Sequence, residues 1–89
     1  MKDLKNWREV TKGLYRYVIG ANCAYEIHVI VWYHDTDILT ASASLYIVGE
    51  WDEANGTHTK RECLMLEQPL FECLNKAVED FDDNVEVEE

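Results

Sequence analysis

Positive charge is the scarcest feature of this chain of 89 residues. Eight Lys and Arg stand against eighteen Asp and Glu, so the formal net charge at pH 7 is −10. Five of the eight bases lie in residues 1–16, whereas residues 79–89 carry seven acids and no base. A field this negative repels nucleic acid and anionic membranes and attracts cation-rich surfaces. The charge therefore argues against direct binding to nucleic acid and favours a basic protein as partner.

Long apolar runs are also missing from the sequence. No window approaches the roughly eighteen consecutive apolar residues of a membrane-spanning helix, and residues 1–8 lack the apolar stretch of a signal peptide. The three cysteines, Cys23, Cys63 and Cys73, do not have the spacing of a disulfide framework. We therefore expect a protein without a membrane partner and with reduced thiols, located in the cytoplasm, or in the host cytoplasm if a phage encodes it.

Motifs that carry chemistry are absent too. The sequence has no glycine-rich phosphate loop, no G-x-S-x-G, and neither CxxC nor HxxxH spacing. On one expected strand His28 and His34 would lie about 20 Å apart, too far to share an ion. His58 is expected near a turn, and a pair of Cys63 with His28 would lack a group to orient the base. The sequence therefore predicts no enzyme, no cofactor and no metal site.

The composition suits one small folded domain. Apolar residues make up 47% of the chain, a normal share for a globular core. Neither a repeat nor a linker divides the sequence. We expect a single α+β domain over residues 1–84 and an acidic tail over residues 85–89. A core of this size is only marginally stable, and dimerisation is one common source of further stability.

Alternation of apolar and polar residues predicts a four-stranded antiparallel meander. Residues 14–19 are rich in Tyr, Val and Ile, which favour strands. Residues 23–34 and 38–52 alternate with a period of two, which is typical of a strand with one buried face. The fourth strand is expected to follow Gly56 and to end near Glu67.

The apolar pattern also predicts how the two long strands pair. A three-residue turn at residues 35–37 would place Val29 opposite Ala43 and Ile27 opposite Leu45, so that the two core faces coincide. A two-residue turn would set core positions against solvent positions, because a slip of one residue reverses the face of a strand.

The dipeptide Asn55-Gly56 predicts a hairpin with a type I′ turn, which requires positive φ at both central residues. The apolar pattern supports the same register, because Leu64 and Leu66 then lie opposite core positions. The pairs expected from this turn are Ala54–Thr57, Asp52–Thr59, Glu50–Arg61, Ile47–Leu64 and Leu45–Leu66.

Residues 69–83 are expected to form a helix, with Pro69 in the first turn, where proline is favoured. Thr59 and Glu62 also match a capping box, which would start a longer helix near Lys60. That longer helix would hold Pro69 in its interior at a cost of roughly 3 kcal/mol, so we prefer a strand there. The apolar stripe expected for the helix is Leu70, Phe71, Leu74, Ala77, Val78 and Phe81.

A second, shorter helix is expected at the N-terminus. Asp3 can cap it, and it would end near Val10, before Gly13. Both helices are expected on one face of the sheet, where the small side chains of Ala41 and Ala43 leave room.

Acids gather at the end of the expected C-terminal helix. The helix dipole disfavours anions there by a few tenths of a kcal/mol each, so their presence is informative. They form either a docking surface for a basic partner or a solubilising tail. The candidate partner-binding acids of the whole chain are Glu50, Asp52, Glu53, Glu72, Glu79, Asp80, Asp82 and Asp83.

The opposite face of the sheet is expected to be too apolar to remain in solvent. The tail or first helix could cover it, a second copy could pair with it in a homodimer, or a partner could bind it. Its expected members include Arg16, Val18, Glu26, Thr40, Ser42, Ser44, Cys63 and Met65. The candidate partner or dimer contacts on it are His28, Ile30, Trp32, Tyr46 and Val48.

In size, charge and compact α+β build, the chain resembles the small acidic inhibitor proteins of phages and mobile elements, the anti-CRISPR and anti-restriction proteins, several of which mimic DNA. No motif carries this resemblance, so no residue role is transferred from those proteins. It implies a non-enzymatic inhibitor that covers the nucleic-acid channel of a basic nuclease or CRISPR effector. Two alternatives remain: an immunity protein against a basic toxin, and a homodimeric interaction protein joined through Trp32 and Tyr46.

Overall fold

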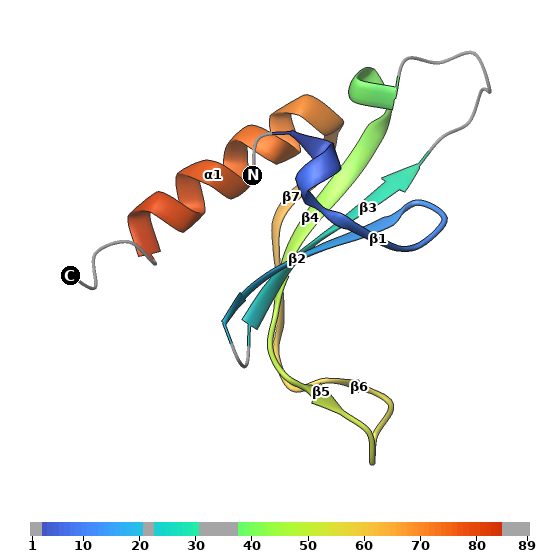
Figure 1. Cartoon of the computed structure of the whole chain (residues 1–89), viewed down its shortest axis with the longest axis vertical. Helices are drawn as coiled ribbons and strands as arrows, with labels where there is room; N and C mark the ends of the chain where they lie inside the picture. The colour runs from blue at the N-terminus through green and yellow to red at the C-terminus, as the bar shows by residue number, and fades with distance from the viewer. Residues whose placement is uncertain (1–2, 21–22, 31–37, 85–89) are drawn as a thin grey trace.

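The computed structural model describes residues 3–20, 23–30 and 38–84. A five-stranded antiparallel sheet, in the order β1-β2-β3-β4-β7, carries one long helix on one face, and a small β5–β6 hairpin extends from it (Figure 1). This arrangement confirms the α+β class, with five strands in the main sheet where four were predicted. The elements in chain order are η1 (Leu4–Asn6), β1 (Arg8–Thr11), β2 (Leu14–Gly20), β3 (Cys23–Ile30), η2 (Ile38–Thr40), β4 (Ser42–Val48), β5 (Trp51–Asp52), β6 (Thr57–His58), β7 (Arg61–Pro69) and α1 (Leu70–Asn84).

The pairing of β3 with β4 follows the register expected from the apolar pattern. Val29 lies opposite Ala43, and Ile27 lies opposite Leu45. All four side chains point to the face that α1 covers, so the two core faces coincide as predicted. The turn expected at residues 35–37 lies outside the described residues.

The N-terminal segment differs from the expected helix. Asp3 does cap a helical turn, because its Oδ1 accepts a hydrogen bond from Lys5 N at 3.1 Å, but η1 is only three residues long. The chain then forms β1, which pairs with β2 through a turn in which Gly13 has a φ of 84°. A helix of eight residues is marginal in water, so pairing along an open sheet edge prevails over local helix formation.

The β5–β6 hairpin lies where Asn55-Gly56 predicted it, but its register is shifted by two residues. Of the two central residues Asn55 and Gly56, only Gly56 has positive φ, so the prediction of a type I′ turn was wrong. Residues 53–56 form a four-residue loop, in which Asp52 Oδ1 accepts a hydrogen bond from Ala54 N at 3.0 Å and Asp52 O accepts one from Gly56 N at 2.9 Å. A shift of two keeps every side chain on its face. The observed pairs are Asp52–Thr57, Trp51–His58, Val48–Arg61, Ile47–Glu62 and Tyr46–Cys63.

Residues 61–69 form a strand, as predicted, and not the start of a longer helix, but this strand runs past its predicted end near Glu67. Pro69 is its last residue and is not in the first turn of α1, which begins at Leu70. Two irregularities in its pairing with β4 change the side-chain pattern beyond Cys63. Met65 lies opposite Leu45 on the helix side, so its expected place on the other face was wrong. Leu66, expected opposite Leu45, is 60% exposed. Bulges of this kind depend on local backbone geometry that a period-two pattern does not encode.

Helix α1 closes the core against β3 and β4. Leu70, Cys73, Leu74 and Ala77 are buried on its inner face, and the small side chain of Ala43 admits the helix. Cys73 replaces the expected Phe71, which is 41% exposed. Trp7, which follows η1, is buried in the same cluster, so the N-terminal segment covers the same face as predicted. None of the described helices is long and apolar enough to cross a membrane.

Candidate functional site

The face of the main sheet opposite α1, here called the open face, carries a row of mostly polar residues across four strands, β2, β3, β4 and β7. The registers place Arg16 opposite Glu26, Glu26 opposite Tyr46, and Tyr46 opposite Cys63. Successive side chains of a strand point to opposite faces, and the residues next to these four point to the side that α1 covers. Strand alternation alone therefore brings the four residues together on the open face.

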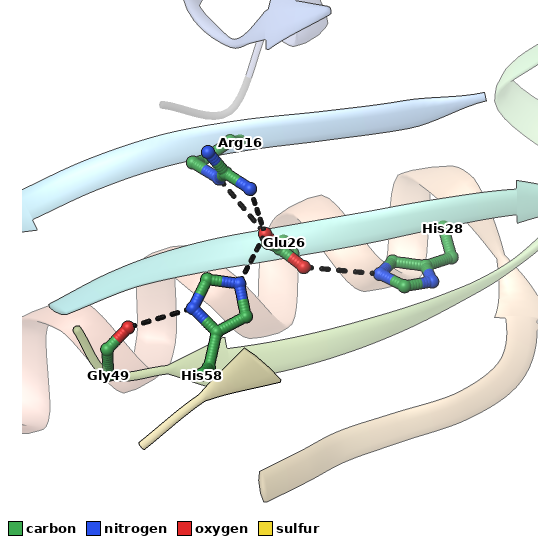
Figure 2. A network of polar contacts seen from close by, with 5 residues as sticks. All are labelled: Arg16, Glu26, His28, Gly49 and His58. Carbon is green, nitrogen blue, oxygen red and sulfur yellow. Dashed lines mark hydrogen bonds and ion pairs between the residues drawn. The ribbon is translucent and has the colours of Figure 1, made fainter. Parts of the chain in front are cut away.

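Glu26 is the centre of this row, although it is only 4% exposed. Its Oε2 accepts hydrogen bonds from Arg16 Nε at 2.9 Å and Arg16 Nη2 at 2.6 Å. His28 Nε2 lies 3.3 Å from Oε1, and His58 Nε2 lies 3.4 Å from Oε2 (Figure 2). We call Arg16, Glu26, His28 and His58 the Glu26 network.

The network keeps a buried carboxylate ionised. Burial by itself raises the pKa of Glu26, but hydrogen bonds from Arg16 and His28 and the positive charge of Arg16 and of His58 outweigh it, so the pKa lies below its usual value. A buried charge with several donors around it is strongly destabilising only when a partner is removed. The network is therefore a fixed polar centre in the open face.

His58 reaches this centre from the β5–β6 hairpin. Its Nδ1 lies 3.0 Å from Gly49 O, and its ring meets that of Trp51 edge-on with centroids 5.0 Å apart. The sequence predicts His58 near a turn and indicates no partner for it. No spacing signal could have linked it to Glu26, because the contact depends on how the hairpin bends over the sheet.

An aromatic and cationic arm continues the row toward β7. The rings of His28 and Tyr46 lie 4.8 Å apart, and the Arg61 guanidinium sits 4.4 Å above the Tyr46 ring. Arg8 shares this face because it pairs with Arg16. At the paired positions described on the open face, Arg8, Arg16 and Arg61 therefore outnumber the single acid, Glu26.

The expected contacts on the open face have mixed outcomes. His28, Ile30 and Tyr46 are half-buried, whereas Val48 is 1% exposed and cannot serve as a direct contact as predicted. Trp32 lies outside the described residues. Val48 and His58 line the same hollow of about 160 Å³ between the hairpin and the open face.

The structure does not gather the eight candidate acids into one site. Glu50, Asp52 and Glu53 lie at the β5–β6 hairpin, far from α1, which carries the other five (Figure 1). Glu50 and Glu53 are exposed, but Asp52 binds the loop backbone and Asn55 Nδ2. The hairpin acids and the helix acids therefore cannot act as one continuous surface.

The five acids of α1 have different surroundings. Asp80 Oδ2 accepts a hydrogen bond from Tyr25 Oη at 2.6 Å, and burial together with this bond raises the pKa of Tyr25. Asp80 therefore anchors the helix to the sheet. Lys76 Nζ lies 3.5 Å from Glu79. The exposed acids of the helix, here called the α1 acidic surface, are Glu72, Glu79, Asp82 and Asp83.

Among the described residues, the thiols and the histidines do not form a further site. Burial raises the pKa of the Cys73 thiol to about 11, whereas Cys63 is exposed. Within residues 3–20, 23–30 and 38–84, no group of three or more His, Cys, Asp or Glu is placed to hold a metal ion. No protein-family model, no curated protein and no solved structure matches this chain. Function must therefore be argued from the two charged faces.

Proposed function

We propose that the protein is a non-enzymatic binding protein whose α1 acidic surface docks on a cation-rich surface of a nucleic-acid-handling protein and inhibits it. The observation that carries this proposal is the segregation of charge between the two faces. Arg8, Arg16 and Arg61 lie on the open face, while α1 holds five acids and one base on the opposite side of the sheet. Among the described residues, the helix side therefore offers a basic partner a cluster of acids, which the paired positions of the open face do not.

The exposure of the acids on α1 also supports docking through the helix side of the sheet. Glu72, Glu79, Asp82 and Asp83 remain open to solvent on a helix whose inner face is fixed in the core. The Tyr25–Asp80 hydrogen bond holds the C-terminal half of α1 on the sheet. A surface that is rigid before binding loses less conformational entropy when it docks.

The position of these acids also argues for a role beyond solubility. Asp82 and Asp83 lie in the last turn of α1, where the helix dipole disfavours negative charge and no base is present. Glu79 lies three and four residues before them, so repulsion between like charges one helical turn apart adds to that cost. Acids that serve only solubility could lie at positions without this penalty, so their retention here supports a docking surface.

The proposed mechanism is competition. The acidic surface covers a cationic channel that otherwise holds nucleic acid, so inhibition is steric and electrostatic. Long-range attraction speeds the encounter at low salt, and screening weakens it as the Debye length falls to about 8 Å at physiological ionic strength.

Capture from host lysate at low salt tests the proposal. The bait is the wild-type chain beside a helix variant with Glu72→Gln, Glu79→Gln, Asp82→Asn and Asp83→Asn. The matched control carries Glu50→Gln and Glu53→Gln at the hairpin. We expect one basic, nucleic-acid-handling protein on wild type and on the hairpin variant, at least about tenfold depleted on the helix variant, and displaced by its nucleic acid. Equal capture by all three baits, or capture that nucleic acid does not compete with, would overturn the proposal.

A further inference from the structure

The β5–β6 hairpin is a two-stranded sheet of its own, and residues 49–50 and 59–60 join it to β4 and β7 of the main sheet. The main ladder ends at the pair Val48 and Arg61, and the hairpin ladder begins at the pair Trp51 and His58. Between them the strand pairing is interrupted, so this joint is where the hairpin can change its angle. Two backbone hydrogen bonds of 2.8 Å cross the joint, from Gly49 N to Lys60 O and from Thr59 N to Glu50 O.

The joint is closely packed at Gly49. A Cβ atom at this position would lie 2.8 Å from Thr59 Oγ1 and 3.2 Å from the Cβ of Lys60. The absence of a side chain at Gly49 therefore lets the two segments of the joint approach each other and lets the hairpin bend over the open face. The bend brings His58 to Glu26 (Figure 2).

His58 has a proton acceptor on each side of its ring. Nδ1 lies 3.0 Å from Gly49 O, and Nε2 lies 3.4 Å from Glu26 Oε2. A carbonyl oxygen and an ionised carboxylate offer no proton. A neutral imidazole carries one N–H and can donate to one of these oxygens, whereas an imidazolium carries two. Only the imidazolium can satisfy both contacts at once.

We propose that His58 is a proton-operated clasp that holds the β5–β6 hairpin against the open face. With both ring nitrogens protonated, His58 contacts Gly49 O at the joint and Glu26 in the sheet. When the ring loses one proton to solvent, one of these two contacts is lost and the hairpin turns outward about Gly49. Histidine suits this role because its ordinary charge change falls between about pH 5 and 8.

Charged and titratable groups from several elements surround the His58 ring. The charged or titratable groups near it are Arg16 from β2, Cys23, Glu26 and His28 from β3, and Glu50 from the joint. Glu26 stabilises the imidazolium, and Arg16 opposes it because it already binds the same carboxylate oxygen. Arg61 of β7 lies over Tyr46 instead. The Gly49 carbonyl is neutral, so the hydrogen bond from His58 Nδ1 to Gly49 O adds to the attraction between His58 and Glu26 without adding a charge.

Release of the clasp would change a defined part of the surface. The hollow of about 160 Å³ beside His58 is also lined by Arg16, Val18 and Trp51. Trp51 and Val18 are 52% and 66% exposed, so apolar side chains already border its mouth. Outward movement of the hairpin would widen this hollow and expose Val48.

NMR of the ¹⁵N-labelled chain between about pH 5 and about pH 8.5 tests the clasp. At the acid end we expect protons on both ring nitrogens of His58. As His58 titrates, hydrogen exchange at the Gly49 and Thr59 amides should accelerate by about tenfold beyond the intrinsic effect of pH, because these amides bridge the joint. The Trp51 indole resonance should shift with the same midpoint.

Two variants separate the clasp from a merely structural role. His58→Gln removes the titrating ring and should abolish the transition at the joint, whereas His28→Gln, which alters the other histidine of the network, should leave it in place. The proposal fails if exchange at Gly49 and Thr59 follows the intrinsic pH dependence alone in the wild type. It also fails if the transition persists in His58→Gln. Should His58→Gln not fold, the titrations of wild type and His28→Gln still decide.

Discussion

Glu26 holds together the polar side of the sheet. Its carboxylate meets Arg16 at 2.6 Å with two histidines within 3.4 Å, yet it is 4% exposed. Glu26→Gln leaves the Arg16 guanidinium and the two imidazole rings facing a neutral amide. We expect a loss of about 2 kcal/mol in the free energy of unfolding, less than for a fully buried pair, because the Arg16 side chain keeps 31% exposure.

Denaturation with urea measures this loss. Glu53→Gln, at an exposed loop position, is the matched control and should stay within about 0.5 kcal/mol of wild type. Equal stability of Glu26→Gln and wild type would show that the network does not stabilise the fold.

The same residue makes stability depend on pH. The pKa of Glu26 is lower in the folded chain than in the unfolded chain. Its charge therefore stabilises the fold above the unfolded value of about 4.3, and this stabilisation is lost as pH falls through the folded value. The difference in unfolding free energy between wild type and Glu26→Gln should shrink as the pH drops from about 6 to about 3. A difference that stays constant over this range would contradict the assignment.

Burial distinguishes two of the cysteines. The pKa of the Cys73 thiol is raised to about 11, first by desolvation, so it holds little thiolate at neutral pH. Cys63 is exposed. Iodoacetamide should modify Cys63 of the native chain well before Cys73, as peptide mass mapping would show. Equal rates would mean that α1 does not shield Cys73.

The network itself could not be predicted from the sequence. Period-two alternation placed Glu26, His28 and Arg16 on one face correctly. The partnership of Glu26 with His58 requires the bend of the hairpin at Gly49, which no residue pattern encodes. Likewise, the sequence predicted Asp80 as one more surface acid, whereas the structure shows that its Oδ2 accepts a hydrogen bond from Tyr25 Oη.

At the scale of elements, the outcome depends on which signal sets the register. The β3–β4 pairing was predicted because both strands have one buried face, and a slip would reverse it. The register predicted for β5–β6 was wrong because the loop is longer than a two-residue turn. Asp52 stabilises this longer loop by accepting hydrogen bonds from Ala54 N and Asn55 Nδ2. In β7, bulges moved Met65 to the helix side. Apolar alternation therefore predicted faces well and turn geometry poorly.

The β1–β2 hairpin depends on Gly13. Its φ of 84° is disfavoured for other residues, and an added Cβ would lie 3.2 Å from Val29 O. Gly13→Ala should lower the free energy of unfolding by about 1–2 kcal/mol through strain and crowding. Thermal unfolding would measure it.

Two other glycines serve as controls for this substitution. Gly56 has a φ of 66° with open space around it, so Gly56→Ala should cost less than Gly13→Ala. Gly20 has neither positive φ nor a near contact, so Gly20→Ala should be close to neutral. A Gly13→Ala variant as stable as Gly20→Ala would rule out the β1–β2 turn described here.

At the scale of the whole molecule, one small sheet separates two charged layers. The chain carries a net charge of −10, yet the described paired positions of the open face hold three arginines and one buried acid. Composition alone predicted a basic partner but could not say which face would meet it. Under the proposed function the helix side meets it, because strand alternation puts Arg16 and Arg61 on one side of the sheet and α1 lies on the other.

The dependence of affinity on salt tests this choice most directly. Fluorescence anisotropy would follow binding of the labelled chain to its captured partner from low salt to about 0.15 M. We predict a steep loss of affinity with salt for wild type and for Glu50→Gln/Glu53→Gln. For the variant with Glu72, Glu79, Asp82 and Asp83 neutralised, we predict weaker binding and a shallower slope. An unchanged slope in that variant, or a larger effect at the hairpin, would contradict docking through the α1 acidic surface.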